Sequence, residues 1–245
     1  MGVLYDTIGK GYAEMRRPDR RIALAVETAL GSAQSVVNVG AGAGAYEPVK
    51  RLVVAVEPSI AMISQRPAGS APAVQACASS LPFGNDSFDA ALSVLTVHHW
   101  RHRAQGLGEL RRVARRRVVI LTWDRASPGF WLSDYFPELL DLDRSLFPSV
   151  GELERALGPV SVDPVPIPHD CTDGFLGAHW RRPAAYLDER VREAISTFSK
   201  LPDAAPGLAR LSADLASGQW RRKYGALLRE TALDLGYRLI VAGAS

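Results

Sequence analysis

The sequence is poor in cysteine and has no long apolar run. Cys77 and Cys171 belong to no CxxC pair and to no Cys/His cluster, which argues against a structural zinc site and predicts two reduced thiols. No window approaches the roughly 20 uninterrupted apolar residues that a membrane-spanning helix needs. The first 20 residues lack the apolar core of a secretory signal. We therefore expect a cytoplasmic protein that binds neither a metal ion nor a membrane.

Lysine is also scarce, because most of the 29 basic residues are arginines, and the formal net charge is only +3. The densest basic group consists of Arg111, Arg112, Arg115, Arg116 and Arg117. A phosphate-binding stripe is one interpretation of this group. However, Leu107, Leu110 and Val113 mark the buried side of the same predicted helix, and the arginines fall largely off that side. We interpret the arginines as a solvated helix face and expect no nucleic-acid partner.

Short apolar runs alternate with helical patterns over the first half of the chain. The predicted strands cover residues 35–39, 52–56, 73–77, 88–95 and 118–121. The predicted helices cover residues 20–30, 46–50 and 103–114, with a further helix opening at Pro58-Ser59. Alternation with short connections predicts an α/β protein whose parallel sheet is covered by helices on both faces.

The pattern changes after residue 124. Residues 125–148 are rich in aromatic side chains without strand periodicity, and three helical patterns occupy residues 187–228. Between these regions we expect a short helix at 150–157 and a proline-rich edge strand at 160–167, and we expect a last strand at 237–242. We predict a core made of residues 1–124, 149–170 and 237–245. Residues 125–148 and 171–236 are then a helical cap on the substrate side.

A glycine-rich turn follows the first predicted strand, within the run Asn38–Gly44. Small residues between a strand and a helix allow a ligand to lie against bare backbone at the helix N-terminus. Glu57 closes the second strand, 17 residues after Gly40. A carboxylate at that position is suited to accept hydrogen bonds from both ribose hydroxyls of a nucleoside. The turn and the carboxylate together predict a nucleoside site.

Two cofactors fit such a site. Gly40, Gly42 and Ala45 satisfy the permissive GxGxxA pattern of dinucleotide binding, which by itself is a weak signal. Three observations favour S-adenosylmethionine over NAD. Gly44 extends the spacing to GxGxG, the tract 79–89 separates the third and fourth strands, and a late pair of strands follows a long insertion.

These motifs together resemble class I S-adenosylmethionine-dependent methyltransferases. The similar segments are residues 37–47, 54–59, 81–90 and 94–100. The resemblance is continuous over residues 35–124 and is strongest to the branch of the quinone-biosynthesis and trans-aconitate methyltransferases. It implies a Rossmann-like, doubly wound seven-stranded sheet with an antiparallel last strand. It also implies S-adenosylmethionine as the cofactor.

The resemblance assigns the residues of the glycine turn and of the second strand. Gly40, Ala41 and Gly42 are expected to pack against the methionine part of the cofactor. Glu57 is expected to hold the ribose, and Pro58 to lie near the adenine. These five positions form the methionine and ribose half of the expected site.

The other half of the expected site follows the third and fourth strands. By the same resemblance, Ala78 and Ser79 flank the adenine ring, while Leu95 and Thr96 lie beneath the reactive sulfonium. Two positions depart from the common pattern. Asn38 stands where many relatives have an acid, and Cys77 stands where an aspartate usually accepts from the adenine amino group. The adenine contact therefore needs another acceptor, such as Ser79 or backbone.

Further candidates lie near the N-terminus and after the fourth strand. Tyr5, Tyr12 and Arg16 are expected to form a lid in which Arg16 pairs with the cofactor carboxylate; an ordinary amphipathic surface helix explains the same residues. His98 and His99 lie where the methyl group is presented, and one of them is a candidate catalytic base. Loop residues bonded only to backbone are the alternative.

We therefore predict methyl transfer to a small-molecule acceptor by in-line displacement under the cap, in a monomer or homodimer. The alternative is an S-adenosylmethionine-binding protein without methyl transfer, such as a cyclase or a regulator. A nucleic-acid methyltransferase is disfavoured, because residues 96–99 contain neither an Asn/Asp-Pro-Pro-aromatic tetrad nor a Pro-Cys nucleophile. A nicotinamide dehydrogenase ranks last. The acceptor itself is not readable from the sequence.

Overall fold

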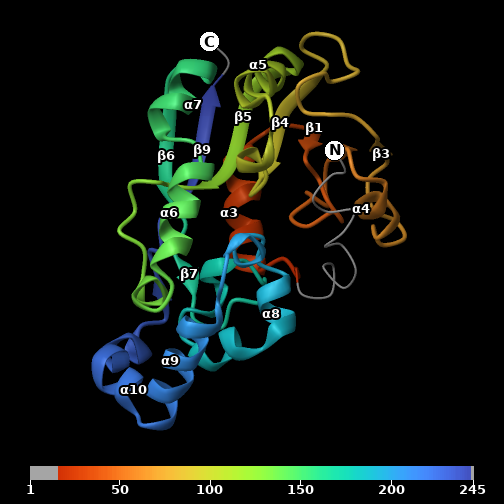
Figure 1. Cartoon of the computed structure of the whole chain (residues 1–245). Helices are drawn as coiled ribbons and strands as arrows, with labels where there is room; N and C mark the ends of the chain where they lie inside the picture. The colour runs from red at the N-terminus through yellow and green to blue at the C-terminus, as the bar shows by residue number, and fades with distance from the viewer. Residues whose placement is uncertain (1–15, 244–245) are drawn as a thin grey trace.

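The computed structural model describes residues 16–243, and within them a seven-stranded sheet forms the centre of the fold (Figure 1). The strands are β1 (Ser35–Val39), β2 (Leu52–Val56), β3 (Ala73–Val74), β4 (Phe88–Val94), β5 (Ala114–Trp123), β6 (Val160–Pro164) and β9 (Tyr237–Gly243). Their order is β3-β2-β1-β4-β5-β9-β6. The first five are parallel, and β9 is antiparallel to both β5 and β6. The predicted α/β class and the antiparallel last strand are confirmed.

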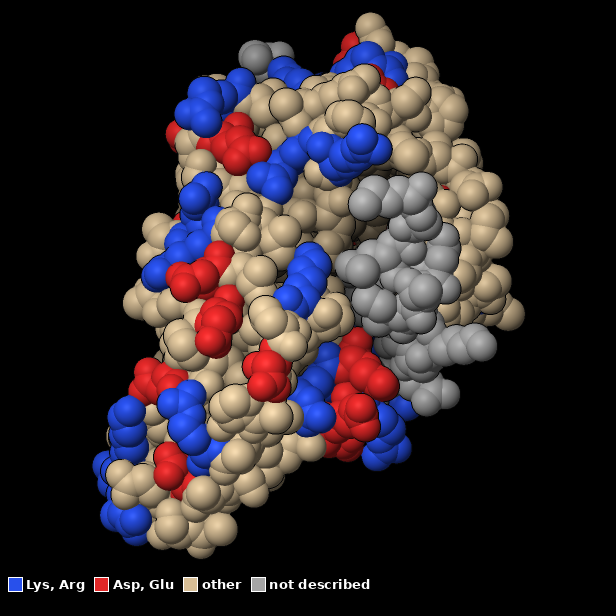
Figure 2. All heavy atoms as spheres, in the orientation of Figure 1, with Lys and Arg blue, Asp and Glu red and all other residues tan. Residues whose placement is uncertain are grey.

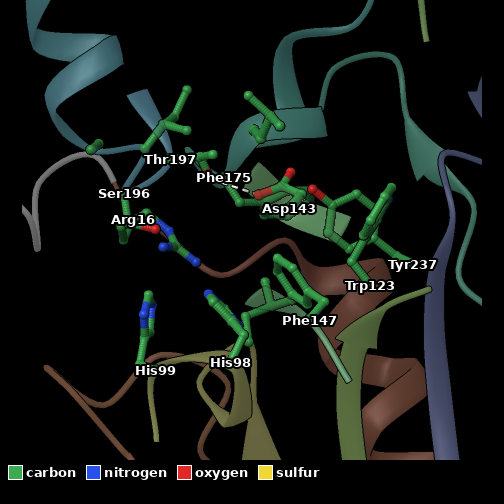
Figure 3. Close-up of a pocket in the computed structure, with 14 residues that line it drawn as sticks. Arg16, His98, His99, Trp123, Asp143, Phe147, Phe175, Ser196, Thr197 and Tyr237 are labelled. Atoms are coloured by element: carbon green, nitrogen blue, oxygen red, sulfur yellow. Dashed lines mark hydrogen bonds between the residues drawn. The ribbon is translucent and has the colours of Figure 1, made fainter. Parts of the chain in front are cut away.

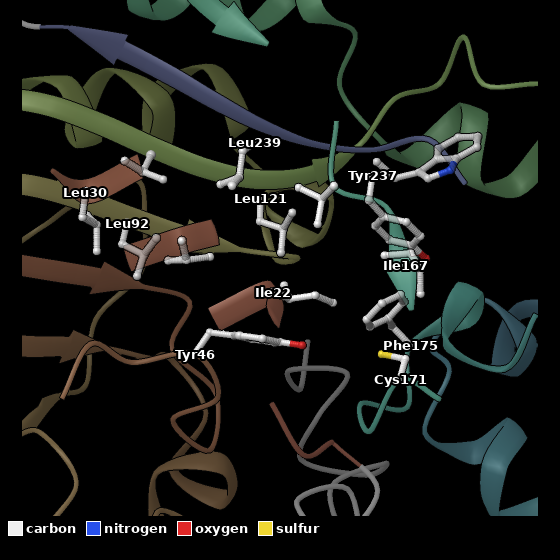
Figure 4. Close-up of a cluster of buried hydrophobic side chains, with 14 of the residues drawn as sticks. Ile22, Leu30, Tyr46, Leu92, Leu121, Ile167, Cys171, Phe175, Tyr237 and Leu239 are labelled. Atoms are coloured by element: carbon white, nitrogen blue, oxygen red, sulfur yellow. The ribbon is translucent and has the colours of Figure 1, made fainter. Parts of the chain in front are cut away.

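Helices cover both faces of this sheet. Helix α3 (Arg20–Leu30) packs on one face, and α5 (Arg103–Val113) and α7 (Val150–Leu157) pack on the other. Successive strand residues alternate between the two cores, so that Val36 belongs to the α3 side and Val37 to the α5 side. In Figure 4, Ile22 and Leu30 of α3 lie along the side chains from the central strands.

Local signals set the ends of α3. Asp19 precedes the helix with extended backbone, and its carboxylate accepts a hydrogen bond from the Arg21 amide at 2.9 Å. Gly31 ends the helix with a φ of 54° that disfavours other residues. The short α4 (Ile60–Ser64) begins in the same way at Ser59, whose hydroxyl accepts from the Met62 amide. Both helix starts agree with the sequence prediction.

The predicted helix at 46–50 is wrong, because those residues form turns. Tyr46 has a φ of 61°, and Gly44 has a φ of 95°, so the backbone adopts the left-handed region twice at this point. Pro48 follows, and proline lacks the amide hydrogen that a continuing helix needs. The glycine turn therefore opens into an irregular loop and not into a helix N-terminus.

The arginine cluster is also placed differently from the prediction. Arg111 and Arg112 lie on α5, but Arg115, Arg116 and Arg117 belong to β5, which begins at Ala114. The strand extends this far because Ala114 pairs with Phe88 of β4. Figure 2 shows basic and acidic side chains side by side over much of the visible face, without one continuous basic stripe. The absence of a nucleic-acid partner stays a prediction.

The carboxylate of Asp89, on β4, holds the start of β1 in place through backbone hydrogen bonds. Its carboxylate accepts from the amides of Gln34 at 2.8 Å and Ser35 at 3.2 Å, and it pairs with Arg115 at 2.9 Å. The hydrogen bond from the Gln34 amide, with the Arg115 side chain next in importance, lowers the pKa of Asp89 to about 2. The ionised form therefore stabilises the fold above the usual Asp pKa of about 3.9, and this contribution disappears as the pH falls through about 2.

We expect Asp89→Asn to lower the free energy of unfolding by about 1–2 kcal/mol at pH 7. The difference from the wild type should shrink between pH 4 and pH 2, as the wild-type carboxylate is protonated. Urea unfolding at several pH values measures it. Asp163→Asn, at an exposed position of β6, is the control and should change little. A loss that does not depend on pH would contradict the assignment.

Apart from the helices that flank the seven-stranded sheet, the remaining segments form a helical cap, most of which lies below the sheet in Figure 1. Its elements are η2 (Trp131–Asp134), α6 (Pro137–Leu146), η3 (Leu176–His179), η4 (Pro183–Leu187), α8 (Glu189–Glu193), η5 (Phe198–Lys200), α9 (Ala205–Ala216), α10 (Gln219–Tyr224) and η6 (Gly225–Arg229). The strands β7 (Ile167–Pro168) and β8 (Ala232–Leu233) form a separate small sheet. An aromatic cluster around Trp131 fills the cap interior. The predicted boundaries between core and cap stay a prediction.

The structure describes both cysteines and, over most of the chain, the side chains that could bind a metal ion. Cys77 is exposed and Cys171 is buried, and both are free thiols. Among residues 16–243, no three His, Cys, Asp or Glu side chains gather as a metal site. Within the same residues, no helix has the length and apolar character needed to cross a bilayer.

Candidate functional site

The predicted site residues follow three neighbouring parallel strands. The glycine bend follows β1, Glu57 follows β2, and Leu95 and Thr96 follow β4. Because β2, β1 and β4 are adjacent and parallel, their carboxyl ends meet at one edge of the sheet. Ligands of doubly wound sheets bind at this edge.

The bend at residues 40–42 brings bare backbone to this edge. The amides of Gly40 and Ala41 donate to the Val56 carbonyl at 2.8 and 3.0 Å, which fixes the bend against the end of β2. Gly40 and Gly42 have φ values of 73° and 52°. A Cβ on Gly40 would overlap the side chain of Thr96. The bend thus presents main chain almost without side chains, a cradle that fits a ligand lying along the backbone.

Glu57 is turned toward this bend. Its Oε2 accepts a hydrogen bond from the Gly42 amide at 2.9 Å, and its Oε1 accepts from the Ser59 amide at 3.0 Å. The side chain is buried. Two backbone donors therefore hold the carboxylate in place against the bend.

The replacement of the usual acid by Asn38 has a structural explanation. The Asn38 amide donates to Glu47 at 3.3 Å, and Glu47 forms a buried ion pair with Arg66 at 2.8 Å. Arg66 also donates to the Ala71 carbonyl. This network lies behind Gly44, whose added Cβ would approach Arg66 Nη1 at 3.2 Å. Asn38 is therefore used to support the loop after the bend.

The predicted adenine residues lie at the ends of β2 and β3. The Pro58 carbonyl accepts from Gln75 Nε2 at 3.1 Å, which ties the two strand ends together. Ala78 packs toward Gly106 of α5, where an added Cβ would come within 3.3 Å of the Ala78 Cβ. Cys77 points outward and is exposed. The structure places these residues on the β3 side of the glycine bend.

The chain after β4 is locally strained. Leu95 has a φ of 49°, which is unusual for a branched side chain, and its amide donates to the Leu121 carbonyl at 2.8 Å. Thr96 then precedes the short helix η1 (Val97–His99). Strain of this kind is typical of functional sites. Here it turns the chain so that Thr96 meets Gly40 and the two histidines face the cap.

A pocket opens between this edge and the cap (Figure 3). The sheet side contributes Leu95, His98, His99, Trp123, Phe147 and Tyr237. The remaining lining residues are Arg16, Asp143, Phe175, Leu176, Ala194, Ile195, Ser196 and Thr197. The pocket thus combines aromatic and aliphatic walls with several polar side chains, a mixture that suits a small-molecule site.

Both histidines are neutral at physiological pH. Burial, and then the charges of nearby basic groups, lower the pKa of His98 far below its ordinary value and that of His99 to about 3. The His98 ring stacks on Phe147 with centroids 3.9 Å apart. Its Nδ1 is shielded from solvent and has no hydrogen-bond partner among the described residues. A neutral imidazole with an unused nitrogen is thus aimed into the pocket.

Arg16 lines the same pocket but pairs with a protein carboxylate. Its Nε donates to Asp173 at 2.6 Å, and the Tyr46 hydroxyl donates to the other Asp173 oxygen at 2.8 Å. The predicted pairing of Arg16 with a cofactor carboxylate stays a prediction. Tyr5 and Tyr12, the other predicted lid residues, lie outside the described residues.

Asp143 is the pocket residue that the sequence analysis missed. It is buried on α6, one turn after the buried Leu139, and its Oδ1 accepts from the Thr197 hydroxyl at 2.8 Å. Burial raises the pKa of Asp143 to about 6, although Thr197 opposes the shift. An acid at an apolar position of an amphipathic helix was the available signal.

The comparisons with known proteins show the family of the chain. A family model described as a methyltransferase domain matches residues 37–122. A solved structure from Anabaena variabilis, provisionally assigned as a methyltransferase from an antibiotic biosynthesis pathway, is 34% identical with a TM-score of 0.86. The alignment covers 93% of this chain and 98% of that one. The fold is that of the class I S-adenosylmethionine-dependent methyltransferases. The chain belongs to the methyltransferase family, and S-adenosylmethionine is its cofactor.

More distant structures share the fold alone. An S-adenosylmethionine-dependent methyltransferase from Thermotoga maritima is 16% identical with a TM-score of 0.57, covering 98% of this chain and 96% of that one. The [4+2]-cyclase SpnF is 13% identical with a TM-score of 0.54, covering 98% and 93%. No protein of curated function matches the chain in sequence. The predicted quinone-biosynthesis and trans-aconitate branch stays a prediction.

Proposed function

We propose that the enzyme methylates a small-molecule acceptor by in-line displacement in the pocket between Leu95, the histidines and the cap. The observation that carries this proposal is the position of the pocket, which begins at the same sheet edge as the glycine bend and Glu57. The Anabaena variabilis relative is assigned to antibiotic biosynthesis, which supports a small-molecule acceptor here. S-adenosylmethionine, when bound, supplies a methyl group activated by a sulfonium.

The cofactor contacts are proposed from the geometry of the sheet edge. Glu57 grips the ribose, and the bend at residues 40–42 carries the amino-acid tail. Pro58, Ala78 and Ser79 enclose the adenine. Leu95 and Thr96 lie below the transferring methyl group. This arrangement is supported by the carboxylate of Glu57, which accepts from the Gly42 amide and so faces the bend.

The protein contributes mainly orientation. Holding donor and acceptor in line supplies on the order of 7–11 kcal/mol in favourable cases. Neutral His98 and His99 are proposed to contact the acceptor, and the unused Nδ1 of His98 is suited to accept a hydrogen bond. The aromatic walls exclude water from the reacting groups.

Calorimetric titration and transfer of a radiolabelled methyl group test this function. The wild-type protein should bind S-adenosylmethionine and should label at least one member of a panel of neutral and charged small molecules. Tight binding with no transfer to any member would support a non-methylating protein. No binding of the cofactor would contradict the proposal entirely.

A glycine substitution tests the proposed cofactor cradle. Gly42→Ala places a Cβ in the left-handed region, which costs about 1–2 kcal/mol and shifts the amide that Glu57 accepts from. We expect S-adenosylmethionine to bind about tenfold more weakly by calorimetry. Gly69→Ala is the control, because Gly69 has a φ of 85° and open space around it. Gly69→Ala should introduce similar backbone strain and leave the affinity for S-adenosylmethionine unchanged. Equal losses of affinity in both variants would contradict the proposal that the bend at residues 40–42 holds the cofactor.

A further inference from the structure

Asp143 lies where two cavities adjoin. It lines the pocket that contains His98 and His99, and it also lines a second cavity beside η2 and α6. Three other residues, Trp123, Leu176 and Tyr237, line both cavities. Figure 3 shows the carboxylate pointing into the space across from the histidines. A polar group is thus placed in the middle of a mostly apolar chamber.

Among residues 16–243, the carboxylate of Asp143 has one hydrogen-bond partner. Thr197 donates to Oδ1 at 2.8 Å, and no described residue donates to Oδ2 or forms an ion pair with Asp143. The residue is only 5% exposed. Burying a carboxylate with only one neutral donor costs folding free energy. Natural proteins rarely retain such a group unless a ligand supplies another donor. The raised pKa of Asp143 is the consequence of the same burial.

The charges around the chamber indicate which kind of hydrogen-bond donor a bound molecule would offer to Asp143. Lys200 of η5 is the charged group whose field favours the ionised form of Asp143. Arg16 is matched by Asp173, His98 and His99 are neutral, and Tyr237 carries no charge at neutral pH because burial raises its pKa. The field of Lys200 offsets the negative charge of ionised Asp143, so the chamber carries no net negative charge that would attract a cation. A neutral molecule with a hydrogen-bond donor fits better.

We propose that Asp143, held by Thr197, recognises the acceptor, and that the acceptor is a neutral, largely apolar molecule whose hydroxyl group donates a hydrogen bond to Asp143. Its apolar body packs on the aromatic walls from Trp123, Phe147 and Phe175. This inference rests on the proposed function, because it names the acceptor class of the same pocket. It makes Asp143 a specificity-determining residue.

Three naphthalene probes of similar size test the recognition. Binding of 2-naphthol, 2-methylnaphthalene and naphthalen-2-ylmethylamine is measured by fluorescence at pH 7.5, with and without S-adenosylhomocysteine. The wild type should bind 2-naphthol about tenfold more tightly than 2-methylnaphthalene, as expected for one hydrogen bond to a charged group. Asp143→Leu should remove this preference. Asp141→Asn, at an exposed position on the same helix, should retain it.

A second variant covers the case in which Asp143→Leu does not fold. Asp143→Asn keeps an oxygen for Thr197 and removes the charge, so the preference should fall to about threefold. Circular dichroism confirms that each variant is folded. The inference is overturned if the wild type binds no probe, if the amine binds more tightly than 2-naphthol, or if both Asp143 variants keep the full preference.

The two proposals fail in different measurements. Probe binding without S-adenosylhomocysteine depends on the pocket alone, whereas cofactor binding is titrated separately in the same preparations. A protein that selects 2-naphthol through Asp143 but binds no S-adenosylmethionine would refute the proposed function and support the hydroxyl recognition. A protein that transfers methyl groups but keeps its probe preference in both Asp143 variants would support the proposed function and refute the hydroxyl recognition.

Discussion

Replacing Glu57 with glutamine should weaken S-adenosylmethionine binding about 100-fold, because the proposed contacts to the ribose lose the carboxylate charge and the glutamine amino group faces a backbone donor. Both oxygens of Glu57 already accept backbone hydrogen bonds, from Gly42 and from Ser59. A glutamine amide has only one oxygen, so its amino group must face one of these backbone donors. Isothermal titration calorimetry measures the loss.

The control for Glu57→Gln is Glu154→Gln, which makes the same chemical change at an exposed position on α7. It should leave the affinity unchanged. Thermal unfolding without ligand should show that Glu57→Gln remains folded. If its affinity lies within twofold of the wild type, Glu57 does not hold the ribose.

Truncating Trp131 to alanine should cost about 3–5 kcal/mol of the free energy of unfolding, the range measured for large buried aromatic residues. The ring forms edge-to-face contacts with Tyr135, Tyr186 and Trp220 at centroid distances of 6.0, 5.6 and 5.3 Å. Its Nε1 donates to the Trp180 carbonyl at 2.6 Å, in the buried interior. Removing it leaves a large cavity and an unsatisfied carbonyl together.

Urea unfolding followed by circular dichroism and by tryptophan fluorescence measures this effect. Trp131→Phe is the matched variant, since it keeps most of the ring volume and loses only the Nε1 donor. It should cost about 1–3 kcal/mol. A loss below 1 kcal/mol for Trp131→Ala would show that the aromatic cluster does not stabilise the cap.

The strands and the first helix could be predicted because their signals are local. β1 and β2 are short β-branched runs between turn residues, and α3 has both a capping aspartate and a terminating glycine. The glycine bend and Glu57 were predictable for a related reason. The strands of a parallel sheet have their carboxyl ends at one edge, so the residues that follow them contact a ligand bound at that edge.

Other features depended on contacts that no local pattern contains. The turn at residues 46–50 forms because the Tyr46 hydroxyl reaches Asp173, 127 positions away. Likewise, β5 starts at Ala114 because Phe88 of β4 offers a pairing edge there. Such interactions override helical periodicity, and the sequence window around each residue does not reveal them.

The missed acid of the pocket illustrates the same limit. Asp143 follows leucines at helical spacing, which indicates that it lies on the buried side of α6. The pattern does not show that η5 brings Thr197 within 2.8 Å or that the histidines lie opposite. The chemistry of the chamber is assembled from segments more than 40 residues apart, and only the folded chain brings them together.

The position of β9 has a consequence for how this protein emerges during translation. β9 lies between β5 and β6, and β6 pairs with no other strand of the described chain. Residues 160–164 are synthesised before residues 237–243. The segment that forms β6 therefore has no pairing partner until the intervening residues have been made. The edge of β5 that later pairs with β9 also stays unpaired during this time. An unpaired strand edge is a template for aggregation. Nascent chains stalled before residue 237 should therefore depend on chaperones.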